Sequence, residues 1–293
     1  MDLAYNRPQG AYIASEMLFT LSRTTRITIE PHQDQRPEEG PGNNHAGWPS
    51  PRGLCAWFEI DVELTEIPDP ETGYIIGIKE IDQAVRRVAR PLLMKSLLGS
   101  AGYGTAELTR RIHSGAAEVL GMTPSTLRLR LSPRHELAWR TSPRALENDT
   151  NMSSSKSNLL IREQFEFAAS HRLHCPERSD EWNRDTFGKC NNARGHGHNY
   201  RVEVVARTTM DEHGMPVLGF AGLEAIVDEL VIARFDHRHL NEECEEFADL
   251  NPSVENITRV CRDLIREPIA QAGGGLESIT VWETEKTSCT CTG

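Results

Sequence analysis

No apolar run in this 293-residue sequence approaches the roughly 18 residues that a membrane-spanning helix needs. An excess of positive charge is also absent, because 43 acidic side chains outnumber 32 basic ones and give a formal net charge of -11. Without a dominant basic surface, the chain is not expected to bind nucleic acid or an acidic membrane.

We also expect no secretory leader and no disulfide scaffold, because no secretory signal is visible and the cysteine spacing is not that of a scaffold. Residues 1–10 are polar and contain Pro8, which is unlike the apolar core of a signal peptide. The seven cysteines are an odd number. These observations predict a reduced, cytoplasmic protein with free thiols.

Residues 190–200 carry the densest group of metal-binding side chains, in the order Cys-Asn-Asn-Ala-Arg-Gly-His-Gly-His-Asn-Tyr. This stretch runs into an alternating apolar segment, so His196 and His198 point to the same face of a predicted strand. An earlier alternating segment ends in His171. If the two strands pair as a hairpin, three imidazoles converge, and catalytic zinc usually has three protein ligands. All-imidazole ligation favours zinc.

The chain contains an internal repeat. Residues 53–88 align with residues 195–230 at a constant offset of 142, and both segments pair an alternating strand with an apolar helical stripe. We therefore expect an α+β protein with a first unit at 1–141, a linker rich in Ser, Asn and Pro at 142–158, and a second unit at 159–293. Each unit is expected to read strand, long loop, strand, turn, strand, helix, helix, strand.

The first unit is predicted to be metal-free. Leu54 and Ala56 stand at the positions that this offset matches with His196 and His198. Thr25 matches His171 at a different offset, at which Phe19-Thr-Leu-Ser resembles Phe165-Glu-Phe-Ala. None of these side chains is a zinc ligand. We interpret the first unit as structural.

Two further features of the second unit are candidates for proton transfer. Cys190 lies six residues before His196, and a thiol near a dication can act as a base or nucleophile. A small, inert apolar cysteine is the alternative. The pair Asp236-His237 could move protons, because a carboxylate orients an imidazole. An exposed loop pair is the alternative.

Two glutamates are candidates for binding a substrate. Glu283 lies in the predicted last strand, where a carboxylate can accept two parallel N–H bonds from an amidine-like edge or form a sheet-edge ion pair. Glu255 begins a predicted helix, where it can also complement the helix dipole. Glu107 occupies the equivalent place in the first unit, which weakens the case for Glu255. Cys289 and Cys291 are a weak signal for a metal clip.

These motifs resemble the 6-pyruvoyltetrahydropterin synthase family, which includes the 6-carboxytetrahydropterin synthases of queuosine biosynthesis. The matching motifs are Phe-Ala-Ala-Ser-His-Arg-Leu, Phe-Gly-Lys-Cys-Asn-Asn with Gly-His-Gly-His-Asn-Tyr, Asp-His, Pro-Ser-Val-Glu-Asn and Trp-Glu-Thr, all in the second unit. The resemblance implies a zinc ion on His171, His196 and His198, Cys190 as general base, Asp236 and His237 as proton relay, and Glu283 as anchor of the pterin ring.

The resemblance also implies a fold and a reaction. The family's T-fold is a four-stranded antiparallel sheet with two helices on one face. The implied reaction converts 7,8-dihydroneopterin triphosphate to 6-pyruvoyl-tetrahydropterin and releases triphosphate. The six-residue spacing between Cys190 and His196 resembles that of the pyruvoyl-forming branch of the family. A 6-carboxytetrahydropterin product is the alternative. A catalytically silent pterin-binding or assembly protein is a third hypothesis, which the intact set of site residues disfavours.

The tandem arrangement departs from the family pattern and affects the expected assembly. Family protomers form twelve-stranded barrel trimers, and two trimers stack. We expect a homotrimer in which the first units replace one of the two stacked trimers, which gives a pseudo-hexamer of T-fold units. In the alternative, metal-binding and metal-free units alternate around each ring.

Overall fold

The computed structural model describes residues 17–30, 49, 53–99, 102–141 and 159–293. The strands are β1 (Phe19–Ile29), β2 (Ala56–Glu66), β3 (Thr126–Arg130), β4 (His135–Arg140), β5 (Leu159–His171), β6 (His196–Thr208), β7 (Arg238–His239), β8 (Gly275–Thr284) and β9 (Thr287–Thr292). The α-helices are α1 (Ile78–Leu98), α2 (Thr105–Leu120), α3 (Asp180–Phe187), α4 (Phe220–Val227), α5 (Ala233–Phe235), α6 (Leu240–Glu243) and α7 (Val254–Gln271). Shorter helical segments are η2 (Gly188–Asn191), η3 (Asp228–Ile232) and η4 (Glu245–Phe247). No helix among these residues is long and apolar enough to cross a membrane.

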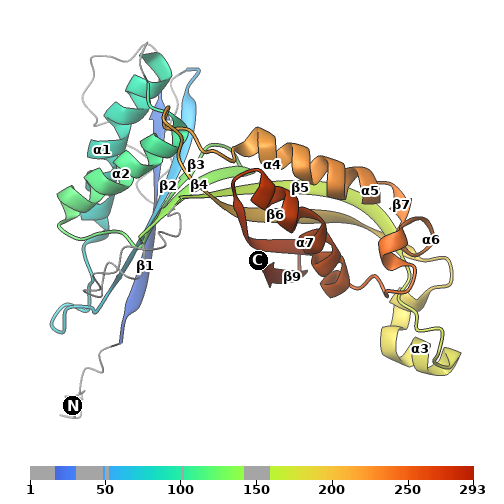
Figure 1. The fold of residues 1–293 in the computed structure, drawn as a ribbon. Helices are drawn as coiled ribbons and strands as arrows, with labels where there is room; N and C mark the ends of the chain where they lie inside the picture. Colours follow the sequence, from blue (N-terminus) through green and yellow to red (C-terminus); the bar gives the residue numbers. More distant parts are fainter. Residues whose placement is uncertain (1–16, 31–48, 50–52, 100–101, 142–158) are drawn as a thin grey trace, which may run out of the picture.

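All nine strands belong to one sheet. Eight form a row in the order β1-β2-β3-β4-β5-β6-β8-β9, with every neighbour antiparallel, and β7 pairs parallel with β5 off this row. Figure 1 shows the row running from the first half of the chain into the second. The predicted α+β class is confirmed.

The order of elements differs from the expected one. The strand expected before the first helix of each unit is not formed: no strand lies between β2 and α1 or between β6 and α4. In the second half, the turn after β6 contains only an isolated bridge between Met210 and Pro216. A strand follows the expected closing strand instead, namely β4 after β3 and β9 after β8. Apart from α3, α5, β7, α6 and the η segments, which among the described residues occur only in the second half, both halves read strand, strand, helix, helix, strand, strand.

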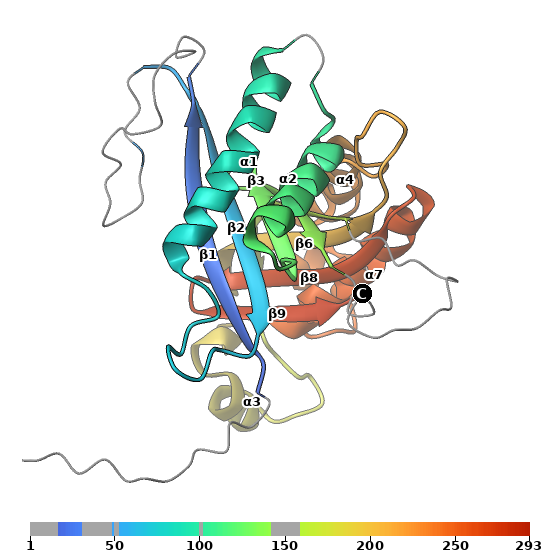
Figure 2. The ribbon, with the colours of Figure 1, turned by 90° about the vertical axis from the view of Figure 1, so that its left-hand side faces the viewer.

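The helices cover one face of the sheet. Leu129 of β3 pairs with Leu137 of β4, which pairs with Ile161 of β5, and all three are buried beneath helices. Figure 2 shows α1 and α2 over the strands of the first half. The opposite face carries ion pairs, such as those of Arg130 with Asp61 and Glu136. Burial of the apolar face is the main favourable contribution to folding.

Pairing of β4 with β5 joins the two halves side by side. The ladder runs from His135 opposite Glu163 to Trp139 opposite Leu159. This pairing contradicts the expected arrangement in which the first unit occupies a separate stacked ring, because both halves extend the same sheet. The expected linker, residues 142–158, lies outside the described residues.

The strand register also corrects one alignment. Thr25 pairs with Ile60, whereas Phe165 pairs with Val202. Since Ile60 and Val202 match at the offset of 142, Thr25 matches Phe165 and not His171. The position that matches His171 is then residue 31, which lies outside the described residues. Similarity of side chains suggested the wrong offset between β1 and β5. The correct register follows only from the pairing of β1 with β2 and of β5 with β6.

Candidate metal centre

Three imidazoles meet at the end of the β5–β6 hairpin. His171 lies opposite His196 in the ladder, and His198 is two residues further along β6. Nε2 of His171 and Nε2 of His196 are 3.1 Å apart. Each of the three residues offers a ring nitrogen, and these nitrogens all lie within 4.8 Å of one another. The group could therefore hold a metal ion.

A backbone carbonyl fixes the orientation of the His171 ring. Nδ1 of His171 donates a hydrogen bond of 2.7 Å to the carbonyl oxygen of Pro252 when it carries the proton, which leaves Nε2 with a free lone pair. Burial lowers the pKa of His171 to about 4, so the ring is neutral near pH 7. A neutral imidazole with a fixed tautomer is the form that binds metals.

The other two rings pass a test of fit for a cation. Nε2 of His198 and Nδ1 of His196 are buried without a hydrogen-bond partner among the described residues. Buried polar atoms in folded proteins are normally satisfied. A metal ion bound to the three rings would give the His198 nitrogen a partner, so the donor set suits a borderline cation such as zinc.

Glu283 lies against the same histidines. Its Oε1 is 3.4 Å from Nε2 of His171 and 3.6 Å from Nε2 of His198. Because the His171 ring is neutral near pH 7, its contact with Glu283 is not a conventional ion pair. A group bound to this carboxylate would lie directly beside His171 and His198.

The loop between β5 and β6 brings Cys190 to the centre. Cys190 lies in η2, and its carbonyl accepts a hydrogen bond of 2.9 Å from Leu173 N–H just after β5. Cys190 and His196 line the same cavity of about 730 Å³. Gly195 closes the loop at φ 71°, where an added Cβ would lie 2.8 Å from Nε2 of His239. The turn therefore requires glycine.

The cavity beside Cys190 is mainly basic. Arg172, Arg184 and Lys189 line it, with Asp180 as the one acidic residue among its lining residues. Sequence reasoning missed this group, because Arg184 comes from α3, which carried no motif. Three cations facing one cavity are suited to a polyanionic ligand.

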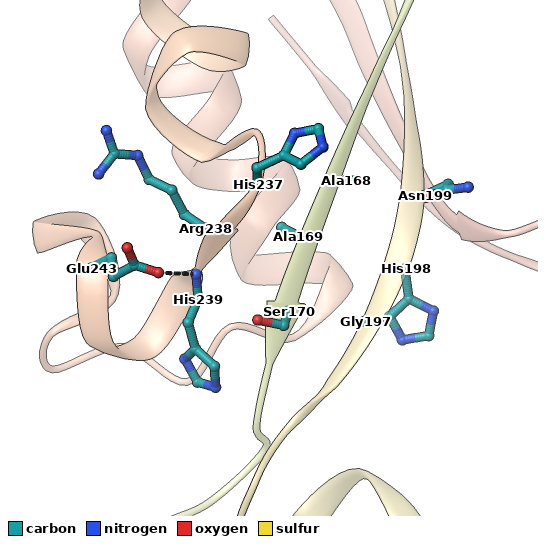
Figure 3. Close-up of a pocket in the computed structure, with 10 residues that line it drawn as sticks. All are labelled: Ala168, Ala169, Ser170, Gly197, His198, Asn199, His237, Arg238, His239 and Glu243. Carbon is teal, nitrogen blue, oxygen red and sulfur yellow. Dashed lines mark hydrogen bonds between the residues drawn. The ribbon is translucent and has the colours of Figure 1, made fainter.

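Asp236 and His237 occupy the other edge of β5. Asp236 Oδ1 accepts a hydrogen bond of 2.8 Å from Ala168 N–H, and Oδ2 lies 2.8 Å from Nδ1 of His237. The hydrogen bond from Ala168 N–H has the largest effect and lowers the pKa of Asp236, and the bond with His237 lowers it further. Figure 3 shows the segment from His237 to His239 approaching β5 on the side away from β6. No hydrogen bond among the described residues joins this pair to the three metal-binding histidines.

His237 combines backbone strain with exposure. Its φ of 58° is the one positive value for a non-glycine residue in the described part of the chain. Such conformations cluster at functional sites. The side chain is 83% exposed and lines a cavity of about 540 Å³ that His198 also lines. The helix that leads to it passes through η3, a π segment, which is also frequent at functional sites.

Glu255 remains outside these contacts. It is exposed in the first turn of α7, next to Val254. In the first half, Glu107 makes ion pairs with Arg110 and Arg111 on its own helix. Among the described residues, Glu255 makes no hydrogen bond or ion pair with His171, His196 or His198. The loop before α7 contributes to the site through the backbone oxygen of Pro252, which is the hydrogen-bond partner of His171. No side-chain motif could indicate a backbone contact of this kind.

Known proteins share this second half. Residues 160–293 match the family model of 6-pyruvoyl tetrahydropterin synthase. The 6-pyruvoyl tetrahydrobiopterin synthase of Drosophila melanogaster is 39% identical over 115 residues, which cover 39% of this chain and 68% of that protein. The chain belongs to the 6-pyruvoyl tetrahydropterin synthase family. The histidine group and the Cys190 loop thus lie within the part that the family model matches.

Relatives within the 6-pyruvoyl tetrahydropterin synthase family are named for different products. The 6-carboxy-5,6,7,8-tetrahydropterin synthase of a Synechocystis strain is 33% identical over 129 residues, which cover 43% of this chain and 86% of that protein. A solved structure of the Caenorhabditis elegans 6-pyruvoyl tetrahydropterin synthase is 35% identical, covers 46% of this chain and 94% of its own, and has a TM-score of 0.42.

Proposed function

We propose that the chain is a zinc-dependent lyase that converts 7,8-dihydroneopterin triphosphate to 6-pyruvoyl-tetrahydropterin with release of triphosphate. The observation that carries this proposal is the convergence of His171, His196 and His198, beside Cys190, within a member of a pterin synthase family. The related proteins named as pyruvoyl-forming synthases support the reaction.

The roles of the metal-binding residues follow from their geometry. The three imidazoles would hold zinc through their ring nitrogens, and the Pro252 carbonyl fixes the tautomer of His171. Bound there, zinc would act as a Lewis acid that makes the C–H and O–H protons of the substrate's hydroxylated side chain easier to remove. Glu283 anchors the N–H edge of the pterin ring beside these histidines.

Proton transfer is assigned to groups on both sides of the hairpin. Cys190 removes a substrate proton as general base, from the cavity that His196 also lines. His237, held by Asp236, carries protons at the other cavity, which His198 lines. Arg172, Arg184 and Lys189 bind the triphosphate until it leaves, because their charges face the cavity of Cys190.

The first half is proposed to be a second, degenerate T-fold unit. Two observations support this: the two halves share the order of their main strands and helices, and their strand pairings match. Ile60 pairs with Leu129, which pairs with Leu137. In the same way, Val202 pairs with Val281, which pairs with Cys289. Leu54 and Ala56 replace the two β6 histidines at the offset of 142. This unit therefore has no equivalent pair of imidazole ligands and is assigned a structural role.

Product analysis tests the reaction. Incubation of the full chain with 7,8-dihydroneopterin triphosphate and zinc is expected to yield a pyruvoyl product with all three side-chain carbons retained, measured by mass spectrometry together with released triphosphate. Similarity to a carboxy-forming relative favours one alternative, in which a two-carbon fragment is lost. Binding of the pterin without any product would contradict both and would indicate a silent binding protein.

A further inference from the structure

A buried acidic side chain lies where the two halves of the chain join. Glu163 of β5 is 3% exposed, on the same face of the strand as the core residues Ile161 and Phe165, and it lies directly opposite His135 of β4. Its Oε1 is 3.0 Å from Nε2 of His135, whereas its Oε2 is buried without a hydrogen-bond partner among the described residues. Such an oxygen is costly to bury, so this carboxyl group needs a counter-charge or a proton.

The first half has an ion pair at the equivalent place. Arg23 of β1 lies opposite Val62, and Glu163 lies opposite Val204. Since the two valines match at the offset of 142, Arg23 is the equivalent of Glu163. Arg23 donates two hydrogen bonds, of 2.9 and 2.6 Å, to the carboxylate of Asp82 in α1. The first half therefore balances the charge of its acidic side chain with a guanidinium.

The second half carries three acidic side chains at the corresponding positions. Helices α1 and α4 begin at residues that match at the offset of 142, so the helix positions can be compared directly. The first half has Arg23, Asp82 and Arg86, and the second half has Glu163, Glu224 and Asp228. The charges thus change from plus, minus, plus to three minus. The carboxylates of α4 and η3 replace the ion pair with repulsion.

The hydrogen bonds of His135 indicate that its ring brings no compensating charge. Ser132 Oγ accepts bonds of 3.1 Å from the N–H groups of both Arg134 and His135, so its own O–H is left to donate to Nδ1 of His135, 2.7 Å away. The ring proton then lies on Nε2, which donates to Glu163. Phe220 of α4 meets the His135 ring edge-on, with the ring centroids 5.0 Å apart.

A proton is the counter-charge that fits this site. Burial, with the nearby charges of Glu224 and Asp228, raises the pKa of Glu163 to about 7. Among the described residues, the three histidines of the metal centre are the one group whose ligand atoms lie close enough together for an ion. The carboxylates at the junction are therefore not arranged around a metal, and the site is balanced when Glu163 is protonated.

We propose that Glu163 and His135 form a proton-dependent lock between the two halves, which is closed when the Glu163 carboxyl carries a proton and loosened when it ionises. The closed lock holds β5 against β4 and beneath α4. Ionisation places a buried carboxylate beside two others, which favours movement of α4 and η3 away from β5 so that water can enter. Because η3 leads through α5 to Asp236, loosening would also reach the segment that carries Asp236 and His237. The lock does not depend on the proposed reaction.

The lock predicts a stability that falls as the pH rises. The folded chain holds the proton of Glu163 more tightly than an ordinary glutamate with a pKa of 4.5, so the contribution is complete below pH 4.5 and is lost as the pH rises through about 7. The ratio of folded to unfolded chain should fall roughly tenfold between pH 6 and pH 8 through this group. Glu163→Gln keeps the shape without the charge and should remove this fall, as measured by urea unfolding of the full chain at each pH. At pH 8 the variant should be more stable than the wild type.

Two further sets of changes separate the lock from a general effect of charge. Glu166→Gln is the matched control, because Glu166 lies on the same strand with an exposed side chain, and its pH profile should follow that of the wild type. Glu224→Gln combined with Asp228→Asn removes two exposed carboxylates that raise the pKa of Glu163. In that variant the fall in stability should move to lower pH without disappearing.

Hydrogen exchange locates the effect in the fold. At pH 8, the amides of β4, β5 and α4 should exchange more slowly in Glu163→Gln than in the wild type, and at pH 6 the two chains should exchange at nearly equal rates. Equal pH profiles of the wild type and Glu163→Gln would overturn the lock. Recovery of the wild-type stability at pH 8 on addition of magnesium or calcium ions would overturn the proton as counter-charge and indicate a metal site.

Discussion

Replacement of Cys190 by alanine is expected to lower kcat for the pterin triphosphate by about 100- to 10,000-fold, the usual contribution of a general base. In the proposed mechanism, the sulfur of Cys190 accepts the proton in the cavity that it lines together with His196. Alanine removes the acceptor and leaves the three imidazoles in place. The variant should therefore retain its metal, which elemental analysis of the purified protein measures beside steady-state kinetics.

Cys175→Ala is the matched control for this variant. Cys175 is also a partly buried free thiol, close to Cys190 in the sequence, and its backbone groups make its hydrogen bonds to Asn183. Its replacement should leave kcat and metal content near wild type. If Cys190→Ala retained full turnover, the base would be another group. A loss of metal in this variant would instead indicate that the thiol is a ligand.

The second large effect is expected for His198→Ala. This change removes one of three ligands, so metal affinity should fall by more than the roughly 10- to 100-fold that loss of an outer hydrogen-bond partner costs. Turnover should fall with it. His198 is near the start of β6 and is not itself part of the hydrophobic core cluster, so the fold is expected to survive and circular dichroism checks it.

His213→Ala is the control for removal of an imidazole. Its side chain is 78% exposed in the turn after β6, next to Glu212. Zinc titration by isothermal calorimetry should give the same affinity as in the wild type. Tight zinc binding by His198→Ala would exclude the proposed ligand set, whereas loss of binding in both variants would point to a distant or unspecific effect.

The metal centre was predictable because strand periodicity is strict. His196 and His198 had to share a face, and His171 ends an alternating segment that pairs with theirs. Cys190 followed from its place in the connecting loop. The structure adds what periodicity cannot carry, such as the Pro252 carbonyl and the left-handed backbone of His237.

Sheet edges and register were less accessible from the sequence. Strand β9 reads Thr-Ser-Cys-Thr-Cys-Thr, which has few large apolar side chains to indicate a strand. The pairing of β4 with β5 joins segments across residues 142–158, and no local pattern encodes such a contact. Thr25 was aligned by side-chain similarity, whereas its true equivalent is fixed by hydrogen bonding to β2. Long-range pairing accounts for these differences.

The most direct test of the metal-centred account is turnover of 7,8-dihydroneopterin triphosphate as a function of zinc added to metal-stripped wild-type chain. The account predicts no turnover without metal and full recovery at one zinc ion per chain, since the described residues contain one group of three histidines that meets the distance condition. Undiminished turnover by the stripped chain, or recovery only at two ions per chain, would contradict it.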